Sequence, residues 1–143
     1  MKLEARIDTK RVDAMLRDQM RKMPRRTKKA LDRTGWQGVD RLRTRTSKGK
    51  GVYGAFPPYS TSYAAWRQKK GRQIAHRDLF VSGQMLNSLL VKTTSRYTDI
   101  TSTRAQERKK IIWTHTQTPW FGFNKRERRW IVDEFVRQFR KAK

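Results

Sequence analysis

The two histidines, His76 and His115, are the side chains of this sequence most suited to general acid–base chemistry. Two imidazoles are too few for a multi-histidine metal site. Asp78 follows His76 by two positions, and side chains so spaced on an irregular segment rarely converge, which favours a turn or surface role for His76. His115 alternates with Trp113 and is expected on one face of a strand. The twelve carboxylates are scattered, mostly beside Arg or Lys, so we expect no enzyme, no cofactor and no metal site.

Cysteine and phosphate-loop chemistry are also missing from the sequence. The chain contains no cysteine, which excludes disulfides and thiolate zinc sites. The GKG at residues 49–51 lacks the spacing and the Ser or Thr of a phosphate-cradling loop. Small basic ribonucleases can work with Arg, Lys and Tyr alone, so a ribonuclease remains an alternative.

Positive charge is the dominant property of the chain. Its 36 Lys and Arg against 12 Asp and Glu give a formal net charge of +24, which is tolerable near a polyanion or an acidic protein surface. Cations that neutralise phosphates release counterions, so binding would weaken as salt rises and would not depend on base sequence. The residues expected to contact nucleic acid or an acidic partner are Arg21, Lys22, Arg25, Arg26, Lys28, Lys29, Arg33, Arg41, Arg43, Lys69, Lys70 and Arg72.

The stretch FPPYSTSYAAWRQKKG, residues 56–71, combines a proline turn, aromatic residues and cations. Its aromatic rings could stack on the bases of a single strand. Aromatics at a proline turn more often anchor the loop to its own core or to a neighbouring subunit, and we favour docking on a neighbour. The residues expected at a subunit or partner interface are Phe56, Pro57, Pro58, Tyr59, Tyr63, Trp66, Trp120 and Phe121.

The chain length of 143 residues fits a single domain, 1–143, with an α+β fold. Hydrophobic residues are 35% and charged residues 34%, so we expect a thin core that is completed by a partner. No segment approaches the roughly 20 apolar residues that span a bilayer, and the N-terminus lacks an apolar run, so we expect a soluble intracellular protein. The expected parts are a basic helical arm (8–46), a Pro/aromatic/Lys loop with a short helix (47–72), a turn plus β-meander (79–116) and a C-terminal helix (124–142).

Helical spacing is clearest at the N-terminal end of the chain. Residues 1–8 alternate like a short strand, and Asp8 or Thr9 can cap the helix that follows. Pro24 is expected to interrupt or kink this helix. The apolar stripe before it is Val12, Met15, Leu16, Met20 and Met23, and the stripe after it is Leu31, Gly35, Val39 and Leu42. Flexible Met side chains favour packing over a ligand site.

The central segment is expected to be short and mixed. Gly71 should end a short helix, and Ser82 should cap a helical turn that carries apolar residues through Leu90. Residues 91–95, 97–103 and 109–116 are rich in Thr, Ile and Tyr and predict a small antiparallel β-meander.

The C-terminal segment carries the strongest helix signal. Asn124 followed by Glu127 predicts a capping box. The stripe Trp130, Ile131, Phe135, Val136 and Phe139 is expected to close the core over the sheet.

Three motifs occur in order along the chain. They are Phe56, Pro57, Pro58, Lys69, Lys70 and Gly71, then Leu79, Ser82, Gly83, Met85 and Ser88, then Pro119, Trp120, Phe121, Gly122 and Phe123. Together with the long basic N-terminus, this order resembles the tailed-bacteriophage virion-morphogenesis family of neck and tail-completion proteins, over about residues 10–140.

The resemblance implies a non-catalytic α+β subunit of the virion that assembles into a six- or twelve-fold ring between the DNA-filled head and the tail. Implied partners are further copies of the chain, portal, connector or adaptor proteins, tail-tube or tail-terminator proteins, and double-stranded DNA in the channel, without a membrane. The alternative is a free-standing, sequence-nonspecific nucleic-acid-binding protein.

Overall fold

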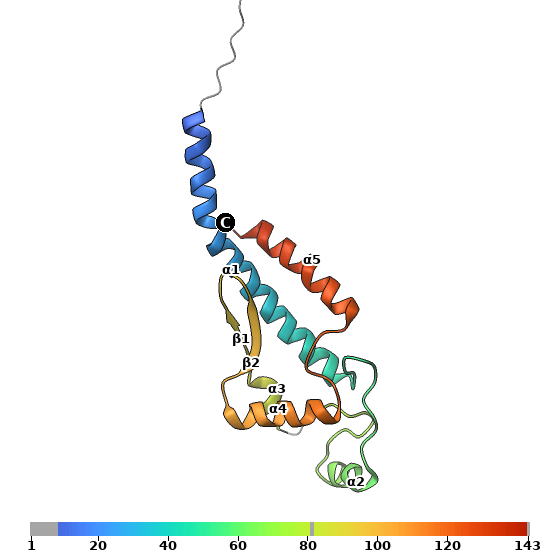
Figure 1. Ribbon diagram of the computed structural model, residues 1–143. Coiled ribbons are helices and arrows are strands. Elements are labelled where there is room, and N and C mark those ends of the chain that lie inside the picture. The colour runs from blue at the N-terminus through green and yellow to red at the C-terminus, as the bar shows by residue number, and fades with distance from the viewer. Residues whose placement is uncertain (1–8, 81, 143) are drawn as a thin grey trace, which may run out of the picture.

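The computed structural model describes residues 9–80 and 82–142, and these adopt the predicted α+β fold (Figure 1). In chain order the elements are α1 (Thr9–Ser47), α2 (Thr61–Lys69), α3 (Gln84–Asn87), β1 (Leu89–Thr93), β2 (Thr98–Ser102), α4 (Ala105–Gln117) and α5 (Lys125–Lys141). The strand expected in residues 1–8 lies outside the described residues.

The long helix α1 contains 39 residues and continues through Pro24, so the proline does not end it. Proline removes one backbone donor and crowds the preceding turn, which bends a helix more often than it ends a well-packed one. Figure 1 shows the axis of α1 changing direction partway along its length, as expected for a kinked helix. The helix therefore has two parts, and only the second of them packs against the rest of the chain.

The β1–β2 hairpin and α5 both pack on α1 and lie to either side of it in Figure 1. The strands are antiparallel, with Leu89 opposite Ser102 and Thr93 opposite Thr98. Gly35 permits the hairpin to approach closely, because a Cβ at this position would lie 2.7 Å from Cγ1 of Val91. A glycine costs helix stability but removes the side chain that would keep the two elements apart.

The third predicted strand, residues 109–116, is wrong, because this segment belongs to helix α4. Glu107 and Ile111, four positions apart, are buried, while Ile112 and Trp113 are exposed. A strand would bury alternate residues, whereas packing against α3 and β2 selects one helical face. The β-branched composition was therefore overridden by tertiary packing.

The predicted helical turn at residues 82–90 is also corrected by the structure. Helix α3 covers only Gln84–Asn87 and begins after Gly83, whose φ of 76° suits glycine, so Ser82 is not its cap. Leu89 and Leu90 lie in β1 instead. The chain thus changes from helix to strand within the apolar run.

Helix α5 begins at the predicted capping box, in which Asn124 accepts from the Glu127 N–H and Glu127 accepts from the Asn124 N–H. Its expected packing over the sheet is wrong, because α5 packs against α1. Of the predicted stripe, Trp130, Ile131, Phe135 and Phe139 are partly buried and only Val136 is exposed, while Glu134 and Gln138 are buried. The packed face of α5 therefore combines the apolar stripe with buried polar side chains.

The hydrophobic core is small, as the composition predicted. It lies where α1, the hairpin, α3 and α4 meet the loop before α5. Its buried members are Val39, Phe56, Leu86, Leu89, Ile111 and Trp120.

Candidate nucleic-acid and subunit interfaces

The predicted cations at the N-terminal end of α1 are at the surface but partly paired. Arg21 and Lys22 contact the Asp18 carboxylate at 3.0 and 2.6 Å. Hydrogen bonds from Lys22 and then Arg21 hold the pKa of Asp18 below its ordinary value of 3.8. Exposed pairs of this kind contribute little stability, so both cations remain available to an anionic partner.

A second group of predicted cations forms an unpaired row on the exposed face of α1. Arg25, Lys29 and Arg33 recur every four residues, so they share one helical face, and all three are exposed. Lys28 is exposed beside them. Within residues 13–80 and 82–142, none of the four forms an ion pair with a carboxylate. This row is open to a polyanion.

Three other predicted contact residues instead hold elements of this chain together. Nε of Arg26 donates to the Ala142 carbonyl at 2.7 Å, which joins α1 to the end of α5. Nε of Arg43 donates to the Leu86 carbonyl at 3.0 Å, and the Arg41 guanidinium lies 4.0 Å from the centre of the Trp130 ring. A partner would have to compete with these contacts, so we correct Arg26, Arg41 and Arg43 to mainly structural roles.

Arg45 is a structural residue that sequence reasoning missed. Its guanidinium is paired with the Glu127 carboxylate and donates to the carbonyls of Trp120 at 2.5 Å and Gly122 at 2.8 Å. Arg45 and Glu127 are 82 positions apart in sequence, and no local pattern connects them. One side chain therefore joins the end of α1 to the loop before α5 and to the cap of α5.

The segment 56–80, which we call the α2 lobe, is organised around a buried ion pair. The Arg67 guanidinium contacts the Asp78 carboxylate at 3.3 Å, and the Tyr59 hydroxyl donates to Asp78 at 2.9 Å. Burial raises the pKa of Asp78, but hydrogen bonds from Gln73, the Phe80 N–H and Tyr59, with the charge of Arg67, outweigh it and hold this pKa below 3.8. The Asp78 carboxylate therefore has a structural role, as the acceptor that joins the parts of the α2 lobe.

The histidines have structural partners in the described chain. Nε2 of His76 lies 2.7 Å from the Ser47 carbonyl oxygen, consistent with the expected turn role, and Asp78 is engaged elsewhere. His115 is on helix α4 and not on a sheet face, which corrects its predicted position. Its Nδ1 accepts hydrogen bonds from the N–H groups of Trp120 and Phe121 at 3.3 and 3.1 Å.

Aromatic residues of the α2 lobe pack mainly on one another. Tyr63 lies between Tyr59 and Trp66, with ring centres 5.2 and 5.4 Å away, and the Arg72 guanidinium lies 5.5 Å from the centre of the Trp66 ring. Trp66 keeps an exposed face. Pro57, Pro58, Lys69 and Lys70 are exposed as well. Figure 1 shows α2 away from α1 and α5, so these residues form a protruding surface.

Two predicted interface residues belong to the interior of the subunit. Phe56 and Trp120 are buried in the core, and the Trp120 Nε1 donates to the Thr114 hydroxyl at 2.9 Å. Phe121 is partly buried against the same core. Phe56 and Trp120 therefore present no side-chain surface to a neighbour, which corrects their predicted role.

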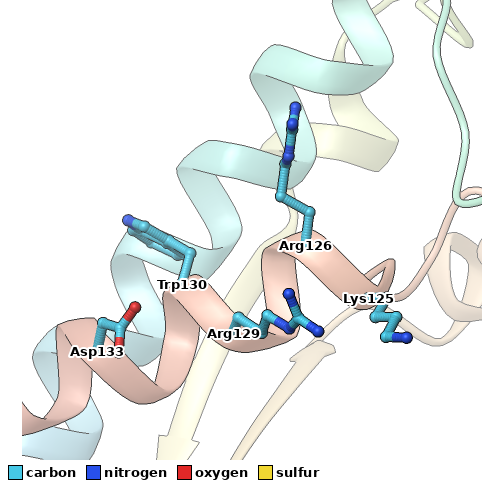
Figure 2. Close-up of a pocket in the computed structure, with 5 residues that line it drawn as sticks. All are labelled: Lys125, Arg126, Arg129, Trp130 and Asp133. Atoms are coloured by element: carbon cyan, nitrogen blue, oxygen red, sulfur yellow. The ribbon is translucent and has the colours of Figure 1, made fainter.

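A shallow pocket of about 530 Å³ lies on the first turns of α5. We call it the α5 pocket, and Figure 2 shows its lining residues, which are Lys125, Arg126, Arg129, Trp130 and Asp133. The pocket brings three cations and one carboxylate around a tryptophan, which no linear motif revealed.

Comparison of the chain with models of known protein families, with curated proteins and with solved structures found no match. Within residues 9–80 and 82–142, no three His, Asp or Glu side chains are grouped as a metal ion would require. None of the helices described there combines the length and apolarity of a membrane-spanning segment. The candidate binding surfaces are the exposed side chains of α1 and of the α2 lobe and the pocket on α5.

Proposed function

We propose that this chain is a structural subunit of a tailed-phage virion, a ring-forming neck or tail-completion protein between the DNA-filled head and the tail. The sequence motifs described above suggest this class. The observation that carries the proposal is the free segment of α1, residues 13–25, in which every side chain except Asp18 is exposed. A helix that protrudes from its own subunit gains stability by packing against another one.

The free segment carries an apolar stripe that has no partner within the described chain. Leu16, Met20 and Met23 have the four- and three-residue spacing of a helix-packing seam, and Met20 is 73% exposed. Continued along α1, the same spacing reaches Ala30 and Thr34, which are buried where α1 packs against α5. The stripe is thus one packing surface that this subunit covers only in part.

A second copy of the chain offers a surface to cover the remainder. The outer side of α5 exposes Val132 and Val136, so one chain carries two different unpartnered apolar surfaces. Contact between two different surfaces of identical chains is heterologous, and it closes into a ring when the rotation permits. The free segment of one subunit would then lie on α5 of the next one, in a six- or twelve-fold ring.

Charge repulsion opposes this contact and gives it a characteristic salt dependence. The free segment carries Arg17, Arg21 and Lys22, and α5 carries an excess of cations. Screening by salt weakens repulsion between exposed charges. The ring should therefore be favoured by rising salt, whereas binding to DNA should be weakened by it. In the virion, portal or connector proteins and tail proteins would be its neighbours.

Native mass spectrometry of nuclease-treated protein over a series of salt concentrations tests this function. We expect a closed oligomer of about six or twelve subunits whose fraction rises with salt. Met20→Glu should give monomers, while the matched control Gln19→Glu, an exposed neighbour on another face, should assemble normally. A Met20→Glu protein that assembles like the control would contradict the proposed contact.

The second candidate is a free-standing, sequence-nonspecific nucleic-acid-binding protein, and the unpaired row of Arg25, Lys29 and Arg33 favours it. Such a protein would remain monomeric at every salt concentration and would bind any duplex with a steep salt dependence. A wild-type chain that shows this behaviour would replace the virion proposal with this one.

A further inference from the structure

Three cations of the α5 pocket have no partner in the subunit. No ion pair joins Lys125, Arg126 or Arg129 to a carboxylate within residues 13–80 and 82–142. Their neighbours are engaged, since Glu127 is paired with Arg45 and Arg128 donates to the Phe123 carbonyl at 2.9 Å. The fold therefore leaves a local concentration of uncompensated positive charge.

The arrangement of these cations is fixed by the first turns of α5. Lys125 and Arg129 are one helical turn apart, about 6 Å along the axis, and Arg126 lies beside them. Figure 2 shows Arg126 extended toward α1, Lys125 pointing the opposite way and Arg129 between them, with Trp130 and Asp133 further along the helix. The helix N-terminus adds little to this attraction, because Asn124 and Glu127 already cap it. Side-chain charge is what the α5 pocket offers a ligand.

We propose that the α5 pocket binds the phosphodiester backbone of double-stranded DNA without regard to base sequence. This inference deepens the proposed function, since a neck ring encloses a duplex. Arginine guanidinium groups donate paired hydrogen bonds to phosphate oxygens, and each neutralised phosphate releases counterions. The net charge of +24 would draw a polyanion toward the subunit from a distance.

Duplex DNA suits the α5 pocket better than an acidic protein does. Specific protein interfaces are built around a desolvated aromatic or apolar centre. The only aromatic residue that lines this pocket is Trp130, which is partly buried and lies under the Arg41 guanidinium at 4.0 Å. The Arg41 guanidinium occupies one face of its ring and the side chain is only partly exposed, so Trp130 is a poor anchor for an apolar group or a base. Contacts to the phosphodiester backbone of DNA need neither an apolar anchor nor a stacking surface.

Asp133 allows the sign of the ligand's charge to be tested. Its carboxylate lines the same pocket and has no ion-pair partner in the described chain. A phosphate bound there would be repelled by Asp133, so Asp133→Asn should bind duplex DNA more tightly. A ligand recognised through an amino group would respond in the opposite direction.

Fluorescence anisotropy with a labelled duplex of about 30 base pairs, at a series of salt concentrations, measures the predicted binding. Arg126→Gln/Arg129→Gln should weaken binding by roughly tenfold near 0.1 M salt and reduce the slope of log K against log salt by about 1.8, or 0.9 for each phosphate that is no longer neutralised. The matched control Arg96→Gln/Arg104→Gln removes two exposed arginines from the hairpin turn and the start of α4, and should cost about twofold at most.

Three results would overturn the inference. The first is equal weakening by the two double variants, which would mean diffuse attraction to the whole surface. The second is unchanged or weaker binding by Asp133→Asn. The third is competition by poly-glutamate as effective as that of unlabelled duplex at equal charge, with the same variant dependence, which would assign the pocket to an acidic protein.

Repeating the titration in the Met20→Glu background separates this inference from the proposed function. The α5 pocket lies within one subunit, so the variant effects should persist in a monomer. Rings that form normally, with no specific effect of Arg126→Gln/Arg129→Gln on DNA binding, would refute the pocket alone. A wild-type chain that never assembles but keeps the pocket's variant dependence would refute the ring alone.

Discussion

Ala30 in the packed part of α1 is fully buried, whereas Met20 in the free segment is 73% exposed, although both lie on the same helical stripe. The two residues have the same helical spacing and differ only in whether another element packs against them. The packed part has α5 and the hairpin against it, and the free segment has neither. A regular apolar stripe therefore predicts a packing surface, but it does not say whether the partner belongs to the same chain.

The two parts of α1 also differ in glycine and methionine content. Gly35 and Gly38 occur in the packed part, and a Cβ on Gly38 would lie 3.1 Å from the Phe123 ring. The free segment has no glycine and carries Met15, Met20 and Met23. Small residues suit one close, fixed neighbour, whereas flexible Met side chains adapt to an irregular surface. This contrast agrees with a partner that is formed only on assembly.

The largest effect is expected where the packed part of α1 ends. Arg45→Met would leave the buried Glu127 carboxylate without its partner and should lower the free energy of unfolding by about 3–5 kcal/mol. Urea denaturation measures this loss. The double variant Arg45→Met/Glu127→Met should recover much of it, because no buried charge remains. A double variant as unstable as the single one would show that the hydrogen bonds to the Trp120 and Gly122 carbonyls matter more than the charge pair.

Truncation of apolar side chains should separate the two parts of α1 directly. Leu42→Ala, in the packed part, removes a buried side chain and should cost about 2–5 kcal/mol. Met20→Ala, in the free segment, should change the stability of the monomer by less than about 0.5 kcal/mol. Both values come from denaturation at low protein concentration. Equal losses would mean that the free segment packs within its own subunit.

Amide hydrogen exchange should show the same contrast without any substitution. Amides of residues 13–25 should exchange faster than those of residues 30–46, because few tertiary contacts oppose local opening of the free segment. On assembly, protection should rise in the free segment and in α5 together. Protection confined to the α2 lobe would place the subunit contact there instead.

The smallest effect is expected from acid. The folded-state pKa of Asp18 lies below 3.8, so its pairing with Lys22 and Arg21 supports the helix above that pH and is lost as pH falls through the folded value. We expect a slight loss of helical protection in the free segment, measured by NMR. Asp18→Asn lacks the pairing at every pH and should show no such step. The same step in Asp18→Asn would assign it to other carboxylates.

Local patterns predicted the parts of the fold whose partners are close in sequence. The capping box joins Asn124 and Glu127 over three positions, and the structure contains it. Helix α2 and its end near Gly71 also depend on neighbouring residues. Backbone propensity and capping act over a few residues, so the sequence displays them directly.

Features that depend on distant partners could not be predicted in this way. Residues 109–116 are rich in β-branched residues, yet they belong to helix α4, because one helical face that includes Ile111 is buried. Glu134 and Gln138 are buried on α5, where Gln138 donates a hydrogen bond to Glu134 at 2.6 Å, and hydropathy does not reveal such burial of polar residues. The α5 pocket depends on which cations remain unpaired in the folded chain. Glu127 is paired with Arg45 and therefore does not neutralise the cations of the pocket.

The contact between Arg26 and the Ala142 carbonyl joins residues 116 positions apart, at nearly the full length of the chain. During synthesis at about 5–20 residues per second, α1 leaves the ribosome on the order of ten seconds before α5 exists to cover it. Throughout that interval the buried and the free parts of the stripe are equally accessible. Nascent chains on one messenger RNA therefore expose more of the apolar stripe than the finished subunit does, until α5 is synthesised and covers the packed part of α1.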